Sequence, residues 1–159
     1  MSTKNYVDIL IESLKKKAAT LDELLEKNEL QFGLLHEQDF DMDAFDKVMD
    51  EKEKLIVDLR FLDSGFTAIY DRAKDTIMQQ KSMYAVKIKE MQALISLITE
   101  KSAKLEASER RNDVKFKNRF RNEQQRLGQS RNTMRAANGY MRNMTGGISQ
   151  DPRFMDTKF

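Results

Sequence analysis

The sequence contains no cysteine, no tryptophan and only one proline among its 159 residues. Without cysteine the chain has no disulfide framework and no cysteine-ligated metal site, which is compatible with a reducing cytoplasm. With six glycines and one proline, it also lacks the turn residues that a β-sheet protein places about every 8–12 positions. Leucine, alanine, glutamate, lysine, methionine and glutamine dominate the remainder, and these residues lose little freedom in a helix. The composition therefore predicts an all-α protein.

Long hydrophobic runs are missing as well. The longest apolar stretch lies in residues 93–98 and is interrupted by Ser96, whereas a bilayer-spanning helix needs about 20 apolar residues. The N-terminal residues show neither the basic region nor the apolar stretch of a signal peptide. We therefore expect a cytoplasmic protein without stable insertion into a membrane.

Residues suited to catalysis or metal binding are scarce. His36 is the single histidine, and it is expected to be solvated or to cap a helix end. Aspartates alternate in residues 39–43 as they do at the start of a calcium-binding loop. The glycine and glutamate that such a loop requires are replaced by Ala44 and Asp50, so the match fails. We therefore expect no enzyme activity, no cofactor and no metal site.

Charge is distributed unevenly along the chain, although the net charge is only +2. Residues 1–100 carry 14 basic and 20 acidic side chains, whereas residues 101–159 carry 14 basic and 6 acidic ones. The two parts therefore have net charges of −6 and +8, which indicates different roles for them.

Apolar residues recur every three or four positions through most of the first two thirds of the chain, as they do in amphipathic helices. The spacing predicts helices over about residues 3–37, 43–78, and 82–111 and onward. Ser82 is the expected cap of the third. Long antiparallel helices of this kind form a three-helix bundle or coiled-coil-like body, which we place over residues 1–111.

Local signals also predict where the second helix begins and where the core ends. Asp41 or Asp43 is expected to cap the second helix through its carboxylate. The apolar seam of the third helix reaches Leu105, after which the same register falls on Glu109 and Asn112. The buried seam is therefore expected to end near Leu105.

Residues 112–144 form a basic amphipathic segment, and residues 145–159 are expected to be a flexible tail. Ten of residues 110–144 are arginine or lysine and two are acidic. As an isolated helix the segment is marginal in water, so we expect it to be mobile until a partner covers its narrow apolar edge. Four apolar side chains recur there at intervals of seven: Phe120, Leu127, Met134 and Met141. The candidate partner-binding residues are Phe116, Phe120, Leu127, Met134, Tyr140 and Met141.

Four interpretations of this segment are open. It is a solvated helix face with Phe116 and Phe120 packed on the bundle, a footprint on nucleic-acid phosphates, a membrane-surface helix, or a helix that captures a partner protein. No nucleic-acid-binding module is recognisable, and the apolar edge is thin and lacks tryptophan. Methionine adapts to different surfaces, and four methionines lie in the last 26 residues. We therefore favour a protein partner over nucleic acid or membrane, and the pattern is also compatible with a homodimer.

Segments throughout most of the chain resemble the FlgN-type flagellar export chaperones. In the first half they are Leu21-Asp22-Glu23-Leu24-Leu25, Asp41 before Phe45, Lys52-Glu53-Lys54-Leu55-Ile56 with Leu59, Leu62-Asp63 and Phe66. In the second half they are Ile88-Lys89-Glu90-Met91-Gln92 with Ile95 and Ile98, Glu109-Arg110-Arg111-Asn112, and Tyr140. Their order and spacing together make the resemblance.

The resemblance implies a cytoplasmic chaperone of the bacterial flagellar type III export pathway. Such a chaperone binds hook–filament junction proteins, keeps them unassembled and delivers them to the export apparatus, and its C-terminal portion binds the cargo. This agrees with the partner-binding interpretation of residues 112–144. The alternative is a structural scaffold or coiled-coil adaptor with no export role, which requires heptads that continue and self-associate.

Overall fold

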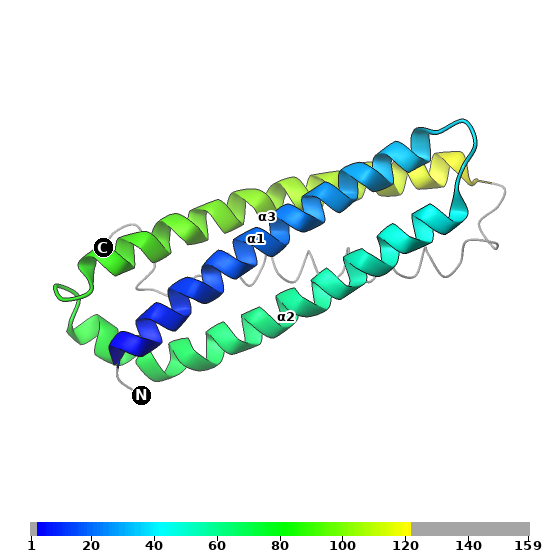
Figure 1. The fold of residues 1–159 in the computed structure, drawn as a ribbon. Helices are drawn as coiled ribbons and strands as arrows, with labels where there is room; N and C mark the ends of the chain where they lie inside the picture. The colour runs from blue at the N-terminus through cyan, green and yellow to red at the C-terminus, as the bar shows by residue number, and fades with distance from the viewer. Residues whose placement is uncertain (1–2, 122–159) are drawn as a thin grey trace.

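The computed structural model describes residues 3–121, which fold into three long helices (Figure 1). Helix α1 spans Thr3–His36, α2 spans Met42–Gln79 and α3 spans Ala85–Arg119. Successive helices run in opposite directions, and this part of the chain contains no strand. The prediction of an all-α antiparallel bundle is confirmed. Within residues 3–121, no helix has both the length and the apolar character that crossing a bilayer requires.

Helix α1 is the central element of the bundle. It packs along its length against both α2 and α3, whereas the backbones of α2 and α3 rarely approach each other. In Figure 1, α1 accordingly runs between the other two helices. Ion pairs support both contacts: Lys17 Nζ lies 2.5 Å from Asp63 Oδ1 between α1 and α2, and Lys101 Nζ lies 2.5 Å from Asp22 Oδ1 between α3 and α1. The fold is thus two helix pairs that share one member.

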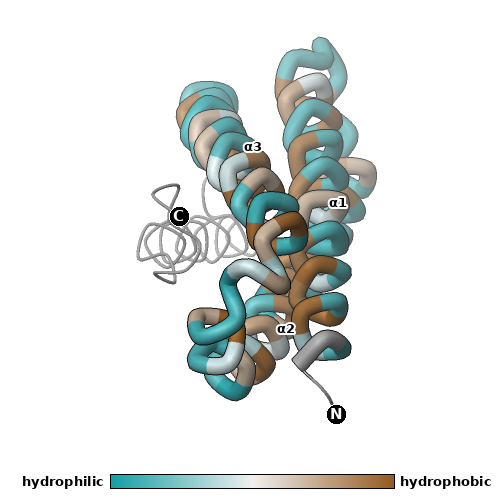
Figure 2. The backbone as a smooth tube through the Cα atoms, turned by 90° about the vertical axis from the view of Figure 1, so that its left-hand side faces the viewer, coloured by the Kyte–Doolittle hydropathy of each residue, from teal (hydrophilic) through white to brown (hydrophobic). Residues whose placement is uncertain are grey.

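The interior consists of two hydrophobic clusters. Hydrophobic and hydrophilic positions alternate along the helices, as Figure 2 shows. The larger cluster, the main core, extends from Val7 near the start of α1 to Leu105 of α3. The smaller cluster, which we call the distal core, lies at the opposite end of the bundle. Its buried members are Leu35, Phe45, Met49, Phe116 and Phe120.

The third helix begins later than predicted. Residues 80–84 form a turn, in which the backbone N–H groups of Met83 and Tyr84 both donate to the carbonyl of Gln80. The helix therefore begins at Ala85, and Ser82 does not cap it. At the other end α3 continues without a break to Arg119. This agrees with the predicted continuation past residue 111, and Phe116 and Phe120 extend the packed body beyond residues 1–111.

Asp41 caps the N-terminus of α2, which confirms one of the two predicted alternatives, Asp41 or Asp43. Its carboxylate Oδ1 accepts a hydrogen bond from the backbone N–H of Ala44 at 3.0 Å, and its own backbone is extended. Because this bond satisfies one free donor of the first turn, Asp41→Ala is expected to lower the free energy of unfolding by about 1 kcal/mol. Urea denaturation measures the change. The control is Asp39→Ala, which removes an exposed aspartate outside the helix and is expected to change stability by less than about 0.5 kcal/mol. Equal losses in the two variants contradict the capping role.

Candidate functional site

Two of the six candidate partner-binding residues lie inside the bundle. Phe116 and Phe120 are 1% and 5% exposed and belong to the distal core. The ring of Phe116 stacks on that of Phe45, with centroids 5.7 Å apart, and the ring of Phe120 meets that of Phe40 edge-on at 4.6 Å. The prediction that these two side chains face a partner is corrected, because they fill the distal core together with side chains of α1 and α2. Leu127, Met134, Tyr140 and Met141 lie outside the described residues.

Two arginines of the basic stretch have structural contacts with α1. The guanidinium of Arg111 lies 3.0 Å from the carboxylate of Glu29 and 3.8 Å from the centre of the Phe32 ring. Arg119 donates from Nη1 to the backbone carbonyl of Leu35 at 3.0 Å, and so satisfies a free acceptor at the end of α1. Sequence reasoning missed both roles, since each partner lies about 80 positions away along the chain.

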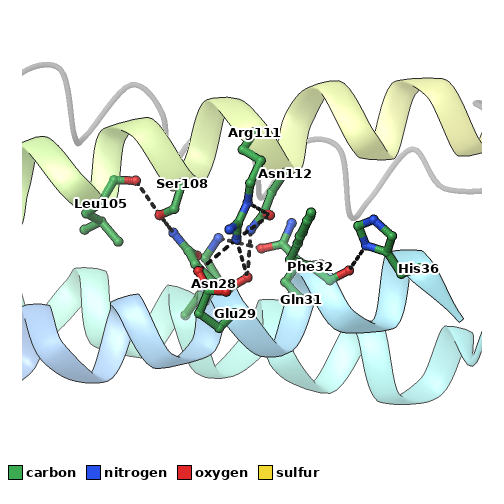
Figure 3. A network of polar contacts seen from close by, with 10 residues as sticks. Asn28, Glu29, Gln31, Phe32, His36, Leu105, Ser108, Arg111 and Asn112 are labelled. Atoms are coloured by element: carbon green, nitrogen blue, oxygen red, sulfur yellow. Dashed lines mark hydrogen bonds and ion pairs between the residues drawn. The ribbon is translucent and has the colours of Figure 1, made fainter.

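Polar side chains join α1 to α3 between the two cores (Figure 3). Asn28 Nδ2 donates to Ser108 Oγ at 2.7 Å, and Asn112 Nδ2 donates to the backbone carbonyl of Asn28 at 3.0 Å. Both asparagines are fully buried. Figure 3 shows these side chains pointing toward one another across the interface of the two helices. Because each bond needs one relative position of the helices, the contacts fix the register of α3 on α1.

A buried ion pair lies at the same level and connects all three helices. Lys52 Nζ of α2 lies 2.5 Å from Glu109 Oε1 of α3 and donates to Gln31 Oε1 of α1 at 2.9 Å. Lys52 and Gln31 are fully buried and Glu109 is nearly so. Burial lowers the pKa of Lys52 from its ordinary value, since the loss of hydration outweighs the attraction of Glu109. Glu109 Oε2 has no hydrogen-bond partner, so the pair is incompletely satisfied.

The sequence did contain a signal for this layer. Glu109 and Asn112 fall in the same register as the buried Leu105, which we interpreted as the end of the seam. Lys52 likewise lies in phase with the buried Val48 and Ile56 of α2. A cation and an anion that both interrupt apolar stripes are candidates for a buried pair.

An apolar hollow opens on the surface along the seam between α1 and α2. It measures about 140 Å³, and nearly all of its lining is apolar. Phe61 forms part of its rim, and this side chain is 79% exposed. Sequence reasoning assigned no role to this place. The hollow is lined by Ile9, Leu10, Ser13, Phe61, Leu62, Gly65, Phe66 and Ile69.

The phenol of Tyr70, which follows Ile69 of the hollow in the sequence, has a raised pKa. Its ring stacks on that of Phe66 with 6.2 Å between centroids, and partial burial together with Asp71 and Asp75 raises its pKa to about 12. The neutral phenol is thus favoured in the folded state. Its contribution to stability is complete below the unfolded value of 10.0 and is lost as the pH rises toward 12.

We therefore expect the stability difference between the wild type and Tyr70→Phe to be constant below pH 10 and to shift against the wild type above it. Denaturation at several alkaline pH values measures this. In an absorbance titration of the phenolates, the same substitution removes the latest step. A late step that persists in the variant assigns the raised pKa to another tyrosine.

Across residues 3–121, no three histidine or carboxylate side chains gather in a group that could hold a metal ion. Comparison with protein-family models, with curated proteins and with solved structures finds no match to this chain. The resemblance to FlgN-type chaperones therefore depends on the short segments quoted above.

Proposed function

We propose that this protein is a non-enzymatic cytoplasmic chaperone of flagellar type III export that binds hook–filament junction proteins. In this role it keeps the cargo unassembled and brings it to the export apparatus. The proposal depends on the ordered series of segments that resemble FlgN-type chaperones, and a long helical body is in keeping with it. Neither a cofactor nor nucleic acid is needed.

The observation that carries the proposal is the spacing of apolar residues in the sequence of the basic segment. Phe116 and Phe120 lie four residues apart on the buried side of α3, and the interval of seven from Phe120 reaches Leu127 and Met134. The bundle covers the first two of these side chains. We therefore narrow the proposed cargo contacts to residues 122–144, where Leu127, Met134, Tyr140 and Met141 remain candidates.

An apolar edge of this size supports reversible capture. Burial of a leucine or methionine side chain contributes about 1.5–3 kcal/mol, and ordering the backbone opposes it by about 1–2 kcal/mol per residue. A moderate affinity follows, which suits a chaperone that must release its cargo.

Calorimetric titration of the full chain with a hook–filament junction protein tests the proposal. The variant Leu127→Ser/Met134→Ser/Met141→Ser is expected to weaken binding at least about tenfold. Truncation at residue 111 is unsuitable, because it also removes Phe116 and Phe120 from the distal core. The matched control is Met83→Ser, which removes a methionine that is exposed in the turn before α3. Absence of binding by the wild-type chain at low and moderate salt rejects the export role.

A structural adaptor is the second candidate, and one observation favours it. The seam of α3 continues through Glu109, Asn112 and Phe116, so the body does not end near Leu105. A scaffold requires such continuity together with self-association. In the same titration, self-association of the chain without any binding of junction proteins supports the adaptor.

A further inference from the structure

The hollow between α1 and α2 has the form of a hole in a helix-packing surface. Phe61, Gly65 and Ile69 are spaced four residues apart and form one ridge of α2, which the glycine interrupts. Ile9 and Ser13 of α1 close the opposite side. A Cβ atom at Gly65 would meet no heavy atom within 4 Å, so the gap in the ridge is open to solvent. A gap bounded by side chains of two helices accepts a knob from a third.

The size of the hollow fits an aromatic ring. Its volume is about 140 Å³. An apolar cavity of about 150 Å³ inside a protein binds benzene, so the hollow holds one phenyl group. Its lining contributes almost no polar surface, and a charged or strongly polar side chain would lose its hydration there without compensation.

The same face of α2 carries such a ring. Phe61 is the most exposed phenylalanine of the described residues, and Val57, one turn earlier, is also exposed. The next turns present the small residues Gly65 and Ala68 to solvent. The outer face of α2 thus carries two large exposed side chains, Val57 and Phe61, before residue 63 and two small exposed residues, Gly65 and Ala68, after it, which makes it complementary to its own reversed copy.

We propose that a second copy of this chain occupies the hollow, in a two-fold symmetric dimer that is formed by antiparallel α2 helices. A two-fold axis at the level of residue 63 places Phe61 of each copy opposite Gly65 of the other. The same axis places Val57 opposite Ile69. One contact is therefore made twice, as an isologous interface requires. This interface is independent of the export role, because it uses neither α3 nor residues 122–144.

The area of the α2–α2 contact limits the affinity of the proposed dimer. Residues 54–72 of α2 span about 28 Å, and a single helix pair of that length buries less than the roughly 800 Å² per partner of a standard interface. The axis also places Lys54 of one copy opposite Arg72 of the other, and their repulsion weakens as salt screens it. We therefore expect a reversible dimer with a Kd in the micromolar range that is tighter at moderate salt than at low salt.

Sedimentation of the full chain over a range of concentrations tests the dimer. The wild type is expected to pass from monomer to dimer. Phe61→Ala removes the knob and Gly65→Leu fills the hole, and each is expected to weaken the dimer at least about tenfold. The control Gly33→Leu adds the same side chain at another open glycine, on α1, and leaves association unchanged. Circular dichroism checks the fold of each variant.

An exchange of knob and hole makes the test specific. The double variant Phe61→Ala/Gly65→Phe has the small residue at position 61 and the aromatic ring at position 65. The same two-fold axis then places the phenylalanine of each copy opposite the alanine of the other. The double variant is expected to regain most of the affinity that either single variant loses. A wild-type chain that is monomeric up to about 1 mM overturns the proposal. A double variant that associates no better than Phe61→Ala also overturns it. The same holds if Gly65→Leu leaves self-association unchanged and weakens only the binding of a different protein.

Discussion

Replacing Lys52 with methionine is expected to lower the free energy of unfolding by about 3–5 kcal/mol, one of the two largest effects of a single substitution in this bundle. Lys52 is fully buried and lies 2.5 Å from Glu109, whose carboxylate is also inside the protein. Methionine fills the space of the lysine stem but leaves the anion without its cation. Urea denaturation of the wild type and the variant measures the loss.

The deficit of Lys52→Met should depend on pH in a defined direction. Without the cation, the carboxylate of Glu109 is left inside the folded protein with an uncompensated charge, whereas in the unfolded state water solvates it. Stability of the variant therefore falls as the pH rises, and its deficit is smaller in mildly acidic buffer than at neutral pH. A deficit that does not change with pH contradicts an unpaired carboxylate at this position.

The double variant Lys52→Met/Glu109→Leu is the matched control. It removes both charges, so no uncompensated ion is left inside, and we expect it to recover most of the stability that Lys52→Met loses. Gln31 loses its partner in both variants, and its contribution cancels in the comparison. If the double variant is as unstable as the single one, the loss comes from packing and not from the stranded charge.

Phe116→Ala is the second substitution with a large expected effect, a loss of about 3–5 kcal/mol. The phenyl ring is 1% exposed and contacts the rings of Phe45 and Phe120 in the distal core. Its removal leaves a cavity at the end of the bundle where all three helices meet. Chemical denaturation measures the global loss, and hydrogen exchange is expected to show the largest effect in the last turns of α3.

Val114→Ala provides the control on the same helix. Val114 is 58% exposed, and we expect its truncation to change stability by less than about 0.5 kcal/mol. If Phe116→Ala and Val114→Ala both change stability by a similarly small amount, Phe116 is not needed for the core. Phe116 is then again a candidate partner contact. If the expected difference is found, a loss of cargo binding by Phe116→Ala reflects damage to the body and does not identify a contact.

Local sequence patterns predicted the helices well because each helix depends on its own periodicity. The first two were placed to within one residue at each end, and Asp41 was among the predicted caps. The start of the third was missed by three residues, since Ser82 is a good capping residue by type but lies inside a turn. The residue before the observed start, Tyr84, is buried in the main core, and no local pattern indicates that contact.

The candidate site was predicted less well because its residues depend on distant partners. Glu109 looked like the end of an apolar seam, and only Lys52, 57 positions earlier, makes its burial tolerable. Arg119 looked like one more solvated cation until the end of α1 was placed beside it. The hollow at Gly65 needs the relative position of two helices, so the glycine alone indicated only a weak point of α2.

The central position of α1 has a consequence for the order of folding. The α1–α2 pair is joined by a short connection, whereas α3 reaches α1 only across sequence separations of about 80 residues, so closure of the second pair has the larger entropic cost. Because Lys52 is enclosed only when α3 docks, its ion pair with Glu109 belongs to the last step. Substitutions there should therefore accelerate unfolding more than they slow folding, while substitutions in the α1–α2 seam act mainly on the folding rate.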